Sequence, residues 1–458
     1  MITSVNDTIA AITTPLGTGG VGIVRLSGEK STEIISKIFS SSPDEKIFPE
    51  LKANHIYHGW IYKPQGSILL DEVILLVFKS PNSYTGEDVI EIQCHGGINI
   101  VKNILTLCIE TGARMAEKGE FTKRAFLNGR IDLSKAEAVL DLIHSKTDKF
   151  TQISAYNLSG KLHVLINQFR SELINLLSVI TAAIDFPEEV NEPEYCYIGE
   201  KIEFLIDKID SVLNSTNSSN LMRQGIKVVI AGKPNVGKSS MFNTLLNMDR
   251  AIVTNIPGTT RDILQETIDI GGIPVTLIDT AGIREIESKH ESHQIESIGI
   301  NISKSCIKDA DLVLFTIDSE QGFTDEDKII YEEIKDKPHI KIASKADLNA
   351  NSDLAGYIHV SSKTRQGFNE IIKKIEKIIL SSENMQESEF STNLRQQECL
   401  QKAKGALLNA KISCTNKEIQ DFISIDLKTA LLCLGEITGE VVTDEILENI
   451  FSNFCIGK

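Results

Sequence analysis

The fold of the chain's central part is decided by residues 232–239, which are Gly232-Lys233-Pro234-Asn235-Val236-Gly237-Lys238-Ser239. An apolar run typical of a buried parallel strand, Ile226 to Ala231, precedes them, and a segment expected to open a helix follows. This order predicts a phosphate-binding loop, in which backbone N–H groups surround a phosphate at a helix N-terminus. Lys238 is expected to reach the β- and γ-phosphate oxygens, and Ser239 to hold Mg²⁺. The alternative is a chance match in a glycine-containing turn, which the flanking strand and helix disfavour.

Four downstream segments complete a nucleotide site, and they are Gly258-Thr259-Thr260-Arg261, Asp279-Thr280-Ala281-Gly282, Lys345-Ala346-Asp347 and Ser361-Ser362-Lys363. We expect Thr260 to bind Mg²⁺ and sense the γ-phosphate, and Asp279 to hold the metal through water. Gly282 offers its N–H to the γ-phosphate. Loops of this kind become ordered only with a triphosphate bound, which predicts a switch.

The base is predicted from Asp347, because a carboxylate accepts from guanine N1–H and N2–H₂ and meets no such donor pair on adenine. The usual asparagine before Lys-x-Asp is Ser344 here, which we expect to weaken the bracing between loops more than the specificity. GTP is therefore predicted, with ATP as the alternative. The predicted GTP-binding residues are Asn235, Val236, Gly237, Lys238, Ser239, Ser240, Thr254, Asn255, Ile256, Pro257, Gly258, Thr259, Thr260, Asp279, Thr280, Ala281, Gly282, Ser344, Lys345, Ala346, Asp347, Ser361, Ser362 and Lys363.

The hydrolytic residues are less evident in the sequence. No arginine is obviously supplied to the phosphates, and Ile283 stands where a water-positioning glutamine is found in Ras. A monovalent cation held by Asn235 and the chain from Thr254 to Thr259 is a candidate for charge neutralisation. The alternative role for Asn235 is bracing of its own loop.

Composition excludes several classes of protein. The net charge is −16, the eight cysteines are scattered singly, and no run of 18 apolar residues occurs. Structural zinc and a membrane span are therefore not expected. Met1 to Asp7 lacks the features of a signal peptide, so a cytoplasmic protein with reduced thiols is predicted. Any RNA contact needs a local basic patch.

Four segments with different patterns follow one another along the chain. Residues 1–125 are predicted to form a small α/β domain, and 126–221 the first half of a helical domain. Strands alternate with helices in 222–380, which predicts a Ras-like G domain with a mostly parallel sheet. Residues 381–458 return to helical patterns. Polar linkers are expected at Ser215–Asn220 and Ser381–Phe390, so the G domain is predicted to be inserted into the helical domain.

With these segments assembled, the chain resembles the MnmE (TrmE) family of tRNA-modification GTPases along essentially its whole length. The motifs that carry the resemblance are Gly19-Gly20-Val21-Gly22-Ile23-Val24-Arg25, Pro81-Asn82-Ser83-Tyr84-Thr85-Gly86-Glu87-Asp88, His95-Gly96-Gly97, Gly119-Glu120-Phe121-Thr122-Lys123-Arg124-Ala125-Phe126-Leu127-Asn128-Gly129, Asp185-Phe186-Pro187 and Phe454-Cys455-Ile456-Gly457-Lys458. The last is the most specific, because a general GTPase has no reason to end in that pentapeptide.

The resemblance implies a homodimer whose N-terminal domain binds a 5,10-methylene- or 5-formyl-tetrahydrofolate. It further implies an FAD-dependent partner, MnmG (GidA), in a heterotetramer or larger complex, with FAD only on the partner. Together they would place a carboxymethylaminomethyl-type group on C5 of the wobble uridine of certain tRNAs. K⁺ would make the G domains dimerise and hydrolyse GTP.

Residue by residue, the resemblance assigns folate contacts to Arg25, Glu91, Arg130 and Lys458, although Arg130 stands where family members can carry lysine. It assigns potassium to Asn235, Thr254, Ile256 and Thr259, and magnesium to Ser239 and Thr260. It gives catalytic roles to Lys238, Cys455 and Glu296. Glu296 is matched through Gln294-Ile295-Glu296-Ser297-Ile298-Gly299-Ile300, although Ser288 to His293 is longer than usual.

Simpler roles remain for several of these residues. Arg25 and Glu91 on neighbouring strands are alternatively a plain ion pair, and Cys455 an inert thiol. The basic cluster Lys123, Arg124 and Arg130 either meets tRNA or is solvated surface. Two rival functions remain. One is a ribosome-assembly or signalling GTPase without modification chemistry, which the neutral-to-acidic flanks disfavour. The other is a folate enzyme with an inert G domain, which the largely intact switch elements disfavour.

Overall fold

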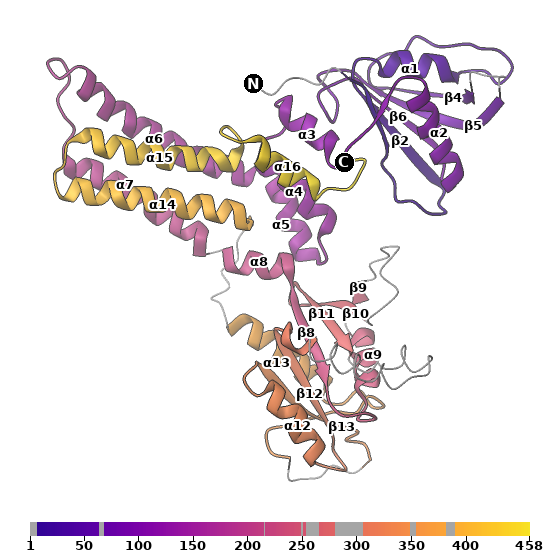
Figure 1. Cartoon of the computed structure of the whole chain (residues 1–458), viewed down its shortest axis with the longest axis vertical. Coiled ribbons are helices and arrows are strands. Elements are labelled where there is room, and N and C mark those ends of the chain that lie inside the picture. The colour runs from indigo at the N-terminus through magenta and orange to yellow at the C-terminus, as the bar shows by residue number, and fades with distance from the viewer. Residues whose placement is uncertain are drawn as a thin grey trace. The chain divides into compact units, whose positions relative to one another are not determined.

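The computed structural model describes residues 7–63, 68–214, 216–248, 251–252, 265–279, 306–348, 354–381 and 390–458. The chain divides into two compact units, and each is described by itself (Figure 1). The first comprises Met1–Leu140, Asn157–Ala182 and Leu427–Lys458, and the second Asp141–Tyr156 and Ala183–Asp426. Among the described residues, no helix has the length and apolar character needed to cross a membrane.

A seven-stranded sheet forms the centre of the first unit, in the order β3-β4-β5-β6-β2-β1-β7. Its strands are β1 (Ile9–Ile12), β2 (Val21–Ser27), β3 (Phe39–Ser40), β4 (His55–Lys63), β5 (Ile68–Phe78), β6 (Val89–His95) and β7 (Arg114–Met115). All neighbours are antiparallel except β1 and β7. Alternate side chains of β2 and β6, such as Val24 and Ile92, enter the core, which places Arg25 and Glu91 together on the other face.

Helices α1 (Ser31–Ile38) and α2 (Ile98–Glu110) supply the other half of that core. The rest of the first unit contains α3 (Glu120–Leu127) and α16 (Asp444–Ser452), and parts of α4 (Leu133–His144), α5 (Asp148–Ser159), α6 (Lys161–Asp185) and α15 (Gln420–Thr438). Side chains of α4 and α16 share a small core with Phe454. The C-terminal segment therefore packs against α4, far from it in the sequence.

The second unit contains a sheet in the order β14-β13-β12-β8-β11-β10-β9. Its strands are β8 (Ile226–Ala231), β9 (Ala251–Ile252), β10 (Gln265–Ile270), β11 (Ile273–Asp279), β12 (Leu312–Asp318), β13 (His339–Ser344) and β14 (Ile358–His359). The five strands from β14 to β11 are parallel, and β10 and β9 run antiparallel to their neighbours. This matches the mostly parallel sheet expected for 222–380.

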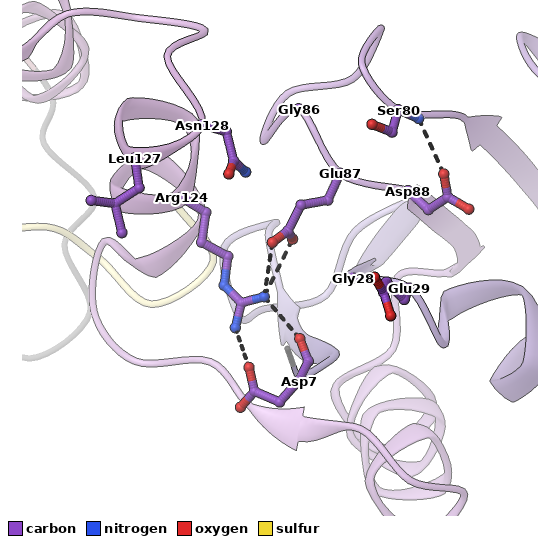
Figure 2. Close-up of a pocket in the computed structure, with 10 residues that line it drawn as sticks. All are labelled: Asp7, Gly28, Glu29, Ser80, Gly86, Glu87, Asp88, Arg124, Leu127 and Asn128. Carbon is purple, nitrogen blue, oxygen red and sulfur yellow. Dashed lines mark hydrogen bonds and ion pairs between the residues drawn. The ribbon is translucent and has the colours of Figure 1, made fainter. Parts of the chain in front are cut away.

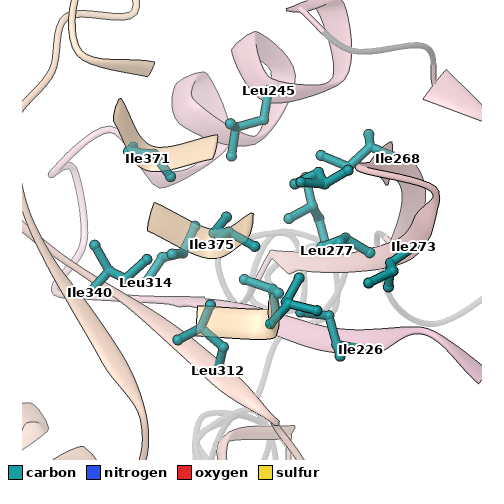
Figure 3. Close-up of a cluster of buried hydrophobic side chains, with 14 of the residues drawn as sticks. Ile226, Leu245, Ile268, Ile273, Leu277, Leu312, Leu314, Ile340, Ile371 and Ile375 are labelled. Carbon is teal, nitrogen blue, oxygen red and sulfur yellow. The ribbon is translucent and has the colours of Figure 1, made fainter. Parts of the chain in front are cut away.

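Helices cover both faces of this sheet. Figure 3 shows the larger core, where β-strand side chains such as Ile226 and Leu314 meet Leu245 of α9 (Lys238–Met248) and Ile371 and Ile375 of α13 (Phe368–Ser381). The opposite core includes Val229, Phe315 and Ile334 of α12 (Asp325–Ile334). Alternation along β8 divides its residues between the two cores, as expected for a sheet buried on both sides.

The helices of the second unit correct one expectation. The segment predicted as a polar linker, Ser215–Asn220, lies largely within helix α8 (Thr216–Gln224). Met222 of α8 is buried in the larger core, so tertiary packing stabilises a helix whose sequence is mostly polar. The expected boundary between 221 and 222 therefore lies within α8. Beyond it, α7 (Tyr195–Asn214) packs along α14 (Leu394–Thr415).

Candidate nucleotide and folate sites

The phosphate loop joins β8 to α9 in the arrangement that the sequence predicts. Asn235 has φ of 65° and Gly237 has φ of 94°, so the chain turns through left-handed backbone conformations before α9 begins. The Lys238 ammonium donates to the carbonyl oxygen of Lys233 at 2.9 Å. The lysine side chain is therefore folded back over its own loop, where a bound phosphate would lie.

Ser239 and Asp279 come together at the carboxyl edge of the sheet. Asp279, the last residue of β11, is fully buried, and its Oδ2 accepts from the Ser239 hydroxyl at 2.7 Å. A hydroxyl and a carboxylate are oxygen ligands suited to Mg²⁺. This pair fits the metal site expected beside the phosphate loop.

The residues assigned to the base lie in the loops after β13 and β14. Asp347 accepts from the Ser361 hydroxyl at 2.7 Å, and this hydrogen bond holds the pKa of the Asp347 carboxyl below its ordinary value. The backbone N–H of Ala346 donates to Val360 at 3.0 Å, which joins the two loops. Asp347 is thus kept ionised and fixed, as an acceptor for guanine N–H groups requires.

Two anchors in this region were not identified from the sequence. Lys345 pairs with Asp318 at the end of β12, at 2.8 Å. The Ser344 hydroxyl contacts both the carbonyl oxygen of Val236 in the phosphate loop and that of Ile317. The expectation that Ser344 weakens the bracing between loops is therefore modified, because serine itself reaches the phosphate loop. The sequence feature that could have identified Asp318 is its position as an aspartate at the end of a buried strand.

Part of the predicted site lies outside the described residues. These residues are Thr254, Asn255, Ile256, Pro257, Gly258, Thr259, Thr260, Thr280, Ala281, Gly282 and Glu296. Of the residues assigned to potassium, only Asn235 is described; of those assigned to magnesium, only Ser239.

The first unit brings the proposed folate residues into one neighbourhood. Arg25 donates from Nε to Glu91 Oε1 at 2.8 Å, so the plain ion pair that the sequence left open does form. The guanidinium of Arg25 also lies 5.2 Å from the centre of the Tyr84 ring. Its Nη1 is buried and has no hydrogen-bond partner among the described residues. One buried donor of Arg25 is therefore left unsatisfied by the described residues.

A pocket of about 510 Å³ opens beside this pair. Glu91, Tyr84 and Ser83 line it, and the buried Ser83 hydroxyl also has no partner among the described residues. Arg130 lies over the Tyr84 ring at 5.2 Å and donates to the Tyr84 carbonyl oxygen at 3.0 Å. The pocket therefore offers a carboxylate, a cation and an aromatic face.

The C-terminus reaches the same neighbourhood. The Phe121 N–H donates to the carbonyl oxygen of Lys458 at 3.1 Å. The backbones of Lys118 and Ile456 pair in an isolated antiparallel β-bridge. Burial and the charge of Arg25 lower the pKa of the Lys458 ammonium, against the opposing charge of Glu91. Cys455 is exposed.

The prediction that Arg124 belongs to a basic surface cluster is wrong. Figure 2 shows its guanidinium turned toward Asp7 and Glu87, and the side chain is almost fully buried. Glu120 is a third partner, at 3.0 Å. Three carboxylates thus neutralise Arg124, and its position in the Glu120–Leu127 helix is explained by internal pairing rather than by an RNA surface. Lys123 and Arg130 do not make a basic patch with it.

Taken together, the left-handed phosphate loop, the Ser239–Asp279 pair and the fixed Asp347 lie at one edge of a mainly parallel sheet. This combination defines a phosphate-loop GTPase.

Comparison with known proteins identifies the family. The model for the MnmE helical domain matches residues 133–455, and that for the GTP-binding protein TrmE N-terminus matches residues 8–130. Proteins named tRNA modification GTPase MnmE from Acetivibrio thermocellus and Carboxydothermus hydrogenoformans are 43% and 41% identical to this chain, each over 99% of both sequences. That from Alkaliphilus oremlandii is 42% identical over 99% of this chain and its own full length. The chain belongs to the MnmE family of tRNA modification GTPases.

A solved structure of Era from Aquifex aeolicus bound to GDP and AlF₄⁻ is also similar in part. It is 23% identical and covers 40% of this chain and 67% of its own, with a TM-score of 0.27.

Proposed function

We propose that this protein uses GTP hydrolysis to drive modification of C5 of the wobble uridine in certain tRNAs. The product is a carboxymethylaminomethyl-type group, its one-carbon unit comes from a tetrahydrofolate, and an FAD-dependent MnmG-like protein is the partner. The observation that carries the proposal is that one chain holds both a guanine-nucleotide site and the Arg25–Glu91 pocket. A signalling or ribosome-assembly GTPase has no use for the second.

Nucleoside analysis of bulk tRNA tests this proposal. A strain lacking the gene should lose the modified wobble uridine, and expression of the chain should restore it. Expression of the Asp347→Asn variant should fail to restore it, because this variant is expected not to use GTP. An unchanged nucleoside profile in the deletion strain would contradict the tRNA function while leaving GTP hydrolysis intact.

The folate fits the first-unit pocket chemically. A pterin ring presents N–H donors along one edge, and Glu91 supplies a carboxylate that accepts them. Tyr84 adds aromatic surface and Arg130 a cation to the lining, and Arg25, whose Nη1 has no partner among the described residues, lies behind them against the Tyr84 ring. When bound, the folate supplies the one-carbon unit. We propose Arg25, Glu91, Arg130 and Lys458 as its contacts, with Cys455 adjacent to the reacting carbon.

Calorimetry with 5-formyl-tetrahydrofolate tests this assignment. Glu91→Gln keeps the size of the side chain but removes the charge, and it should weaken binding by about tenfold or more. Glu72→Gln, on the exposed part of β5, is the matched control and should bind as wild type. Equal affinity in wild type and Glu91→Gln would remove Glu91 from the site.

We propose that potassium activates hydrolysis through dimerisation of the G domains, with Asn235, Thr254, Ile256 and Thr259 as ligands. The support is the exposed Asn235 in the phosphate loop and Ile283 in the position where a water-positioning glutamine would serve instead. GTPase rates should be higher in K⁺ than in Na⁺ at equal ionic strength. Equal rates in the two salts would be incompatible with this mechanism.

Glu296 is the proposed water-positioning residue, assigned by its motif. Glu296→Ala should leave GTP affinity nearly unchanged and lower kcat by roughly 10²-fold or more. Glu285→Ala, Glu287→Ala and Glu291→Ala are matched controls within the same stretch. Normal hydrolysis by Glu296→Ala, together with loss in one of the controls, would shift the assignment to that residue.

We further propose a homodimer formed through the first unit. On the sheet face away from α1 and α2, β4 and β5 leave apolar side chains in solvent, and Ile56 is 71% exposed with Ile74 nearby on the next strand. A second copy of the chain would cover this face. Sedimentation of Ile56→Asp should show a monomer where wild type is a dimer.

We also propose that residues 222–380 are inserted between the two halves of the helical domain, since α7 and α14 pack on each other.

A further inference from the structure

The phosphate loop carries a second lysine, Lys233, which the nucleotide site does not use. Its side chain is only 11% exposed. Its ammonium lies 3.1 Å from the Thr324 hydroxyl and 3.4 Å from Asp327 Oδ2. Asp327 is 0% exposed, so the pair is shielded from solvent screening.

Thr324 and Asp327 also form the capping box that begins α12. The Thr324 N–H donates to Asp327 Oδ2 at 3.0 Å, and the Thr324 hydroxyl donates to the same oxygen at 2.6 Å. One carboxylate oxygen therefore holds the start of the helix and the lysine of the phosphate loop together. The pattern Thr324-Asp325-Glu326-Asp327 marks the helix start in the sequence, but nothing local indicates that Lys233 reaches it.

The backbone of Lys233 has a separate role. Its carbonyl oxygen accepts from the Lys238 ammonium at 2.9 Å. Lys233 is thus anchored by its side chain to α12 and contacts through its carbonyl the lysine that faces the phosphates. A displacement of residue 233 would move the acceptor that orients Lys238.

We propose that Lys233 and Asp327 are a positioning pair that holds the phosphate loop in its nucleotide-binding shape. This inference rests on the proposed binding and hydrolysis of GTP. Neither residue is among those predicted to bind GTP. The pair fixes the start of a loop in which Asn235 adopts a left-handed backbone conformation that is costly for a residue with a Cβ.

Loss of the pair has a definite physical consequence. Removing Lys233 leaves the Asp327 carboxylate buried, and removing the charge of Asp327 leaves the ammonium without its anion, which is unfavourable in either case. The loop then relaxes from its tight curvature, and its N–H groups and Lys238 lose their alignment on the phosphates. Guanine selection through Asp347 is set in other loops and should not change.

Kinetics and nucleotide binding of the full chain test the pair. Lys233→Met and Asp327→Asn should each raise the Kd for GDP and the KM for GTP by about tenfold, with a similar effect in the double variant because the pair acts as one unit. Lys233→Arg should restore most of the affinity. Preference for GDP over ADP should stay as in wild type. Lys335→Met, which breaks an exposed ion pair with Glu332 just after α12, is the control and should bind GDP normally.

The outcomes separate this inference from simpler ones. If Lys233→Met lowers the melting temperature but keeps wild-type Kd and KM, the pair only stabilises α12 and the inference is overturned. Additive effects in the double variant would also overturn it, since the two residues would then act independently. If wild-type protein binds neither GDP nor GTP, the proposed function fails first, and the inference fails with it.

Discussion

Ser344 shows how one side chain can replace another of different length. Its hydroxyl contacts the carbonyl oxygens of Val236 and Ile317, so the strand β13 and the phosphate loop remain joined without the usual amide. Ser344→Ala removes the one O–H donor that these two carbonyl oxygens share, and it should therefore weaken GDP binding by about 1–3 kcal/mol. Fluorescence titration with a labelled GDP measures this. An alanine variant with wild-type affinity would show that the bracing is unimportant.

Ser344→Asn is the complementary change. The longer amide adds at most one neutral hydrogen bond, worth about 0.5–1.5 kcal/mol, and the existing serine contact reduces the gain further. We expect a small increase in affinity in the same titration. A large decrease would mean that the loop has adapted its spacing to serine.

Asp347 decides which base the pocket accepts. The Ser361 hydroxyl fixes one of its oxygens and lowers the pKa of the carboxyl, so the group is ionised near neutral pH. Asp347→Asn replaces an acceptor pair by an acceptor and a donor, which suits xanthine with its 2-oxo group. The variant should lose GTP turnover and gain turnover of xanthosine triphosphate. Continued preference for GTP would remove Asp347 from the base site.

At the scale of an element, α3 is held by charges rather than by an apolar face alone. Arg124 lies between Asp7, Glu87 and Glu120, and nearly all of its side chain is buried. Arg124→Met should destabilise the first unit by less than the roughly 3–5 kcal/mol of a fully buried charge left unpaired, because the buried Glu120 carboxylate keeps Arg114 as a partner. Calorimetry of the full chain should show a lower melting transition. Lys123→Met, at the neighbouring half-buried position, is the control and should have little effect.

The same cluster predicts a dependence on pH. Burial raises the pKa of Glu120, but hydrogen bonds from Arg114, the backbone and Arg124 outweigh it, so the pKa lies below its ordinary 4.5. A carboxyl with a lowered folded-state pKa adds stability above its ordinary pKa, and this contribution is lost as pH falls through the lowered value. The stability difference between wild type and Arg124→Met should therefore be full above about pH 5 and shrink on further acidification. A difference that grows as pH falls would contradict this account.

At the scale of the whole molecule, the C-terminal residues belong with the N-terminal sheet. The carbonyl oxygens of Cys455 and Lys458 accept from Gly119 and Phe121, and Gly457 lies against Ile12, where a Cβ would come within 2.3 Å of its carbonyl oxygen. Deleting residues 455–458 should therefore abolish binding of 5-formyl-tetrahydrofolate. The Kd for GDP should not change, because the nucleotide site lies in the other unit. Calorimetry with both ligands on one preparation measures this, and loss of both would point to general misfolding.

The sequence by itself determined the features that depend on short-range pattern. Strand, glycine loop and helix predicted the phosphate site, and period-two alternation in β2 and β6 accounts for Arg25 and Glu91 lying on one face. Asp279 at the end of an apolar run predicted a residue beside Ser239, because parallel strands end at the same edge. In each case, the local pattern predicts the strand end or the strand face on which a side chain lies, and the pairing of the strands then brings the partners together.

Only the tertiary structure decided the contacts between residues far apart in the chain. The sequence cannot show that Arg124 is buried against Asp7, that Ser344 reaches Val236, or that Lys233 pairs with Asp327. It also misassigned the polar segment before Leu221, which is helical because neighbouring Met222 is buried in a core. Charged and polar side chains have the same pattern whether solvated or paired. Their role is set by which distant segments packing brings against them, and local periodicity carries no information about that.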